Sequence, residues 1–116
     1  MQQIDTPIIH KTYALYRALH AIEKTIPKMN RFTVWQRSEN ICLDLLHGLL
    51  SISHQSPEVR LGSLAQLAPT IDMLRVFIRL SVDVKAINEN QYITLQAAID
   101  EIGRMLGGWL KSLRQR

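Results

Sequence analysis

The chain has 116 residues, 47% of them apolar, a formal net charge of +4 and one cysteine, Cys42, which has no partner for an internal disulfide. A chain of this length buries roughly two-thirds of its unfolded surface, so we expect one domain, residues 1–116, whose core needs neither disulfides nor a structural metal. The N-terminal stretch has no signal-peptide features, and the lone cysteine fits a reducing compartment. No uninterrupted apolar run approaches about 18 residues, which argues against membrane insertion. We therefore predict a cytoplasmic protein.

Two amphipathic segments are expected in the first half of the chain, at about residues 7–26 and 31–53. Apolar residues recur in both at helical spacing, three, four or seven apart. The sequence IPKMNRF separates the two segments, because the residue before a proline is disfavoured in a helix. The sequence SHQSPEVR ends the second segment, with Ser56 and Pro57 suited to starting the next helix.

The third segment is expected at about residues 58–84 and is apolar over much of its circumference. One stripe alternates spacings of three and four, as in the seam of a left-handed bundle. A second flank carries Met73, Val76, Phe77 and Leu80, which predicts a helix buried against more than one neighbour. Pro69 falls inside this pattern and predicts a kink or a break.

The fourth segment is expected at about residues 90–113, after the turn sequence NENQ. Its apolar residues are spaced four and three apart from Leu95 to Leu113. No alternating β-type pattern of useful length occurs. The sequence therefore predicts an all-α fold, an up-down-up-down four-helix bundle.

Three glycines interrupt the fourth segment: Gly103, Gly107 and Gly108. Each costs about 1 kcal/mol relative to alanine inside a helix. The expected compensation is close helix packing, inside the bundle or between subunits. Direct contact of the glycine backbone with phosphate is the weaker alternative, because amides within a helix are already hydrogen-bonded.

Positive charge gathers at the C-terminus, where residues 104–116 contain no acidic residue. The cations are Arg104, Lys111, Arg114 and Arg116. Such a cluster attracts phosphate over a distance. It also complements the helix macrodipole, and composition alone does not separate these two interpretations.

A narrow polar strip of two acids and two arginines crosses the third segment. Its members are Asp72, Arg75, Arg79 and Asp83. One interpretation is a ladder of local ion pairs, Asp72 with Arg75 and Arg79 with Asp83. The other is a binding site, since the planar guanidinium of arginine suits phosphate or a partner's carboxylate.

Catalytic and metal-binding motifs are not evident. His47 and His54 lie seven apart, a loose spacing for a metal pair on a helix, where i, i+4 spacing would be expected. Cys42 stands in an apolar context that favours an inert thiol. We therefore predict no catalytic residue, no metal and no cofactor, and a protein that is not an enzyme.

Two blocks of the chain, MLRVFIRL and IGRMLGGWLKSL, resemble the accessory variability determinant of diversity-generating retroelements. The TIPKMNRF junction is also similar to that family. The family belongs to a wider set of four-helix-bundle proteins that includes the proteins encoded in ribosomal-RNA intervening sequences. The similarity extends from about residue 24 to residue 113.

The resemblance implies a homopentameric ring with a basic surface that binds the retroelement's reverse transcriptase and RNA or DNA. It supports mutagenic synthesis of complementary DNA and has no catalytic chemistry of its own. Arg75, Arg79 and Arg104 match family arginines, and with Lys111 and Arg114 they are the expected contacts to nucleic acid or polymerase. Gly103, Gly107 and Trp109 are the expected positions of subunit packing.

The alternative is a protein-interaction bundle of the wider family with no retroelement role. It would use the apolar third segment to bind another protein. A reverse-transcriptase gene beside this one would favour the first interpretation.

Overall fold

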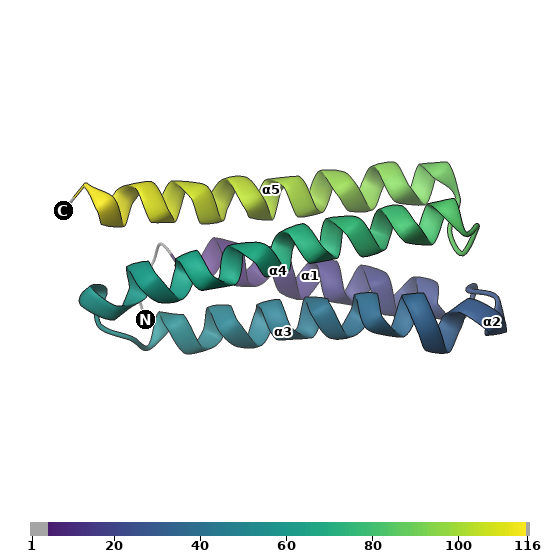
Figure 1. Ribbon diagram of the computed structural model, residues 1–116, viewed down its shortest axis with the longest axis horizontal. Coiled ribbons are helices and arrows are strands. Elements are labelled where there is room, and N and C mark those ends of the chain that lie inside the picture. Colours follow the sequence, from purple (N-terminus) through teal and green to yellow (C-terminus); the bar gives the residue numbers. More distant parts are fainter. Residues whose placement is uncertain (1–4, 116) are drawn as a thin grey trace.

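Four long helices form a rod of 47 × 20 × 20 Å in the computed structural model, which describes residues 5–115 and, from Pro7 onward, their side chains (Figure 1). The long helices are α1 (Asp5–Glu23), α3 (Gln36–Ser53), α4 (Pro57–Asp83) and α5 (Glu89–Arg114). A short helix α2 (Lys28–Asn30) and a π-helical segment η1 (Arg31–Trp35) lead into α3. The described residues contain no β-strand, as predicted.

The four helices alternate in direction, up, down, up and down (Figure 1). Each packs against the next along the chain, and α1 also packs against α5, so the bundle closes around one core. The core is built from the predicted apolar stripes and includes Leu19, Leu45, Leu74 and Ile99, all at most 1% exposed. The predicted bundle is therefore confirmed for the single chain.

Local sequence sets the ends of the helices. Asn88 and Gln91 form a capping box at the start of α5, each side chain accepting the other's backbone N–H, at 2.8 and 2.9 Å. Pro57 occupies the first turn of α4, where no N–H is needed. Lys85 adopts a left-handed conformation (φ 64°) just after α4 and so ends it.

The π-helical segment η1 places an aromatic side chain in the core. Trp35 is fully buried and its indole Nε1–H donates to the Leu19 carbonyl at 3.2 Å, which joins this segment to α1. Arg31 donates to the Ile26 carbonyl at 3.0 Å, in the turn after α1. Arg31 and Trp35 thus fasten the IPKMNRF junction to α1 and its turn, while Met29 and Phe32 in the junction are 83% and 61% exposed.

Pro69 does not break its helix, and that part of the prediction is wrong. Helix α4 runs without interruption from Pro57 to Asp83. Proline removes the hydrogen bond to the carbonyl four residues earlier, here that of Ala65. Pro69 and Ala65 are both exposed, so the side of the helix that lacks this bond is open to water.

Helix α4 is less buried than its apolar sequence predicts. It packs against α3 and α5, as predicted, and Phe77 of the second apolar flank is half-buried, but Met73, Val76 and Leu80 of that flank are 49%, 60% and 41% exposed. By length and composition α4 also meets the criterion for a membrane span, but core helices of soluble proteins meet the same criterion. A single helix of this kind is weak evidence for a membrane.

Candidate nucleic-acid and partner interface

Arg75 links α4 to α5 through two carboxylates. Its Nη1 donates to Asp72 at 2.9 Å and its Nε donates to Asp100 at 3.0 Å. The Asp72 pair confirms the predicted local ladder, whereas no pattern in the sequence indicates Asp100, which lies on another helix. The Arg75 side chain is 35% exposed and its guanidinium is already engaged by two acids.

Gly103 makes room for that guanidinium. A Cβ atom at this position would lie 2.6 Å from Nη2 of Arg75, too close for two non-bonded atoms. The compensation for a glycine here is therefore an arginine side chain of the same chain. The close approach expected at Gly103 is therefore made by a large side chain of α4.

Arg79 lies one turn further along α4. Its Nε donates to Asp83 at 3.2 Å, which confirms the second predicted pair. Its guanidinium carbon also lies 5.9 Å from the centre of the Tyr92 ring on α5. The Arg79 side chain is 64% exposed, so it is the more accessible of the two arginines.

The end of α5 carries three exposed cations: Arg104, Lys111 and Arg114, which we call the basic end of α5. Among the described residues, no carboxylate lies within ion-pair distance of any of them. Arg104 and Lys111 are seven residues apart and therefore share one side of the helix. Arg116 lies outside the described residues. The basic end of α5 thus offers cations that need not give up an acidic partner in order to bind phosphate.

Gly107 and Gly108 lie between these cations and have open space around them. A Cβ atom on either glycine would meet no atom within 4 Å. The expectation that they pack tightly inside the bundle is therefore wrong. Gly107 lines a groove of about 190 Å³ between α4 and α5, together with Ala68, Ile71 and Leu106. Subunit packing at Gly103 and Gly107 stays a prediction.

Trp109 belongs to the core of the single chain. Its side chain is 3% exposed, and the guanidinium carbon of Arg60 lies 5.8 Å from the ring centre. Arg60 in turn donates to the carbonyls of Ser53 and Gln55 at 2.8 and 3.0 Å. Trp109 therefore secures the turn between α3 and α4, and it has almost no surface left for the subunit contact expected of it.

An apolar surface runs along the outside of α4. Met73, Val76, Leu80 and Val84, here called the outer face of α4, are 41–60% exposed and follow one another at helical spacing. At one end, Leu80 and Val84 join Phe32, which is 61% exposed, in lining a groove of about 570 Å³. The sequence shows that these residues are apolar and that most of them recur at helical spacing. It cannot show that no helix of the same chain covers them.

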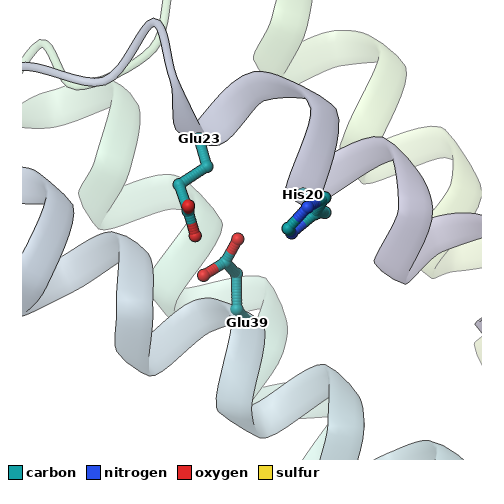
Figure 2. A group of neighbouring side chains, drawn as sticks. All are labelled: His20, Glu23 and Glu39. Atoms are coloured by element: carbon teal, nitrogen blue, oxygen red, sulfur yellow. The ribbon is translucent and has the colours of Figure 1, made fainter.

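A second group of side chains, which the sequence pattern does not reveal, lies between α1 and α3. Figure 2 shows His20 and Glu23 from α1 converging with Glu39 from α3. One donor atom from each lies within 4.8 Å of the others. Burial, followed by the hydrogen bond and negative charge of Glu23, raises the pKa of Glu39 to about 7. His20 and Glu23 share one side of α1, but only folding brings Glu39 to them.

Cys42 is buried, and burial raises the pKa of its thiol to about 12. Its Sγ–H donates weakly to the Thr12 carbonyl at 3.8 Å. A thiol that stays protonated is a poor nucleophile. This environment agrees with the inert cysteine predicted from the sequence.

Comparison with known proteins gives two results. A search of curated proteins finds no match to the sequence. The family model described as bAvd-like matches residues 7–113, nearly the whole chain, and the protein therefore belongs to the bAvd-like family.

Proposed function

We propose that the protein is a non-enzymatic accessory subunit of a diversity-generating retroelement. In this role it binds the element's reverse transcriptase and contacts RNA or DNA through phosphates, so that mutagenic complementary DNA is made. The observation that carries the proposal is the bAvd-like family match, since this family is an accessory, non-catalytic kind of protein.

The basic end of α5 supports the phosphate contacts. Arg104, Lys111 and Arg114 are exposed and pair with no acid of the described residues. Exposed cations gain affinity for phosphate by releasing the counterions condensed on nucleic acid. Phosphate contacts of this kind position a protein without reading base sequence.

Arg75 and Arg79 have a smaller part in phosphate binding in this proposal. Each would have to exchange a carboxylate that it already binds. A protein partner that presents its own carboxylates or backbone carbonyls to this strip fits them better. We therefore assign Arg79, the more exposed of the two, to the reverse-transcriptase contact.

A homo-oligomer, which we propose to be a pentamer, would bury the outer face of α4. Contiguous apolar patches on a soluble protein mark interaction sites. The groove beside Gly107 would receive side chains of the neighbouring subunit. Five chains of charge +4 would together carry about +20, so a modestly basic chain becomes a strong partner for a polyanion.

The test of the phosphate contacts compares two triple variants with the same change of charge. In the first, Arg104, Lys111 and Arg114 are all replaced by alanine. In the second, the exposed residues Arg17, Lys24 and Lys28 are replaced instead. Binding to a fluorescent 20-base-pair DNA and to a single-stranded RNA is measured from low to high salt.

The logarithm of the affinity for duplex DNA falls with the logarithm of salt by about 0.9 for each phosphate neutralised. The first variant is expected to bind more weakly, with a slope smaller by about that amount for each phosphate that it no longer neutralises. The second variant is expected to keep the wild-type slope. An equal reduction of affinity in the two variants would contradict the assignment to the basic end of α5.

The second candidate is a protein-interaction bundle with no retroelement role. The outer face of α4 favours it, since that surface can bind a protein without any nucleic acid. The two candidates differ in the genes beside this one and in the binding of a reverse transcriptase. A chain that binds neither polymerase nor nucleic acid but still uses the outer face of α4 would be this second kind.

A further inference from the structure

We propose that His20, Glu23 and Glu39 form a binding site for one Zn²⁺ ion per chain, which would join the end of α1 to the start of α3. The family role described above does not require this site. It follows from three donors that two helices bring together and from one buried carboxylate oxygen, Oε2 of Glu39, that no donor group of the described residues reaches.

The three donors face one another. His20 and Glu23 are three residues apart on α1, so both side chains project from the same side of that helix. Glu39 points at them from α3 (Figure 2). One imidazole nitrogen and one oxygen from each carboxylate all lie within 4.8 Å of one another.

Glu39 supplies an independent sign that a ligand belongs here. Its side chain is only 6% exposed, and its Oε2 is buried with no hydrogen-bond partner unless a proton is shared with the Glu23 carboxyl. Removing a carboxylate from water without a compensating partner is costly. The residue beside it in the cluster, Glu23, is also acidic and adds to that cost. A divalent cation would satisfy both carboxylates at once.

The kind of donor selects the ion. One imidazole nitrogen with two carboxylate oxygens is a mixed set that suits Zn²⁺, whereas Mg²⁺ prefers six oxygen ligands in an octahedron. Zinc ligands lie about 2.0–2.2 Å from the ion, so a tetrahedral arrangement separates them by about 3.4 Å. The donors are at most 4.8 Å apart, and they would close this difference through rotation of the exposed His20 and half-buried Glu23 side chains.

The surroundings leave room for water and orient the histidine. The Tyr16 ring stacks on the His20 ring, with 6.0 Å between centroids and an angle of 27° between the planes. His20 is exposed, so the side of the cluster that it occupies is open to solvent. A water molecule would complete the four ligands of the ion.

The test uses the full chain after removal of metals by a chelator. Zn²⁺ is titrated into it by isothermal titration calorimetry, with Mg²⁺ as the comparison ion. The site variants are Glu39→Gln and His20→Gln. The matched controls are His47→Gln, which removes an exposed histidine on α3, and Glu58→Gln, which removes an exposed acid on α4.

We expect one Zn²⁺ per chain, an affinity reduced at least about tenfold in Glu39→Gln and His20→Gln, and unchanged affinity in the two controls. We expect Mg²⁺ at the same concentrations to bind far more weakly. Co²⁺ in place of Zn²⁺ should give a visible absorption band that is absent in His20→Gln. Because His20 is exposed, that variant keeps its fold even if Glu39→Gln does not.

Four results would overturn the proposal. They are no Zn²⁺ binding, equal binding by wild type and His20→Gln, an equal reduction of affinity in His47→Gln, and equal affinities for Mg²⁺ and Zn²⁺. Circular dichroism of every variant confirms that the helices are intact before affinities are compared.

Discussion

The Arg75 guanidinium fills the space that a side chain at position 103 would require. A Cβ atom on Gly103 would be 2.6 Å from Nη2 of Arg75. The same guanidinium binds Asp72 on its own helix and Asp100 on α5. Gly103 therefore leaves the space in which Arg75 links α4 to α5, whereas Gly107 and Gly108 leave space that no atom of the described residues occupies.

This difference predicts unequal effects of alanine at two of the glycines. The added methyl group of Gly107→Ala meets no neighbouring atom. Because alanine has the higher helix propensity, this change should raise the unfolding free energy of the single chain by about 1 kcal/mol. Gly103→Ala should gain less, because Arg75 must move and its partly exposed ion pairs are worth about 0.2–1 kcal/mol. Urea unfolding at low protein concentration measures both.

The Arg75→Ala background is the control for this prediction. Without the guanidinium, Gly103→Ala should stabilise the chain about as much as Gly107→Ala does. The difference between backgrounds is the coupling energy of the two positions. Equal effects of Gly103→Ala with and without Arg75 would contradict the conclusion that Gly103 makes room for the Arg75 guanidinium.

Helix positions and the two local ion pairs can be predicted because short-range signals determine them. Apolar periodicity, Pro57 and the NENQ turn place α4 and α5 within a residue or two of their observed ends. The pairing of Asp72 with Arg75 follows from their spacing of three. Asp100 cannot be predicted, since its contact with Arg75 depends on how two helices dock.

Two further differences between prediction and structure have the same origin. The predicted break at Pro69 does not occur, because the exposure of Pro69 leaves the missing hydrogen bond on a side of α4 that is open to water. Glu39 does not stand out as a possible ligand in the sequence, because its neighbours His20 and Glu23 lie on another helix. A sequence shows which residues share a helix face, and only packing shows what that face meets.

The outer face of α4 predicts a defect in assembly when a charge is placed on it. Leu80→Glu should lower the solution mass, because a carboxylate would have to be buried in the subunit contact. Leu50→Glu on α3 is a matched control, since Leu50 is 42% exposed and Leu80 is 41% exposed. Light scattering of both variants at the same concentration makes the comparison. A mass lowered equally by both changes would argue against a specific contact at α4.

Glu39 predicts a dependence of stability on pH in metal-free protein. Its pKa is about 7 in the folded chain and about 4.5 without the effects of folding, so the folded state binds the proton more tightly. Its contribution to stability is therefore full below pH 4.5 and is lost as the pH rises to about 7. Glu39→Gln should remove this dependence, since an amide has no proton to release.

Thermal melts at pH 5 and pH 8 with a chelator present test this prediction. The melting temperature of Glu39→Gln minus that of the wild type should be larger at pH 8 than at pH 5. The charged and titratable groups that act on this site, Glu23, His20 and Tyr16, are the same in both proteins. An identical change of melting temperature in the two proteins would contradict the raised pKa of Glu39.

Cys42 predicts slow thiol chemistry in the folded protein. Because burial raises its pKa to about 12, the thiolate is scarce at pH 8 and the reagent has no access to it. Labelling with a coloured disulfide reagent should be on the order of 100-fold slower in native protein than in denaturant. Fast labelling of the native chain would mean that the α1–α3 contact opens readily.

The role as an accessory subunit is tested by mixing this protein with the reverse transcriptase of the retroelement to which the proposal assigns it, and measuring the mass by size-exclusion chromatography with light scattering. We predict that the two elute together, and that the protein contributes five times 13.3 kDa, about 66 kDa, to the mass of the complex. The complex should persist at salt concentrations that remove nucleic acid. Separate elution of the polymerase and of this protein, at any salt concentration, would contradict the proposed role.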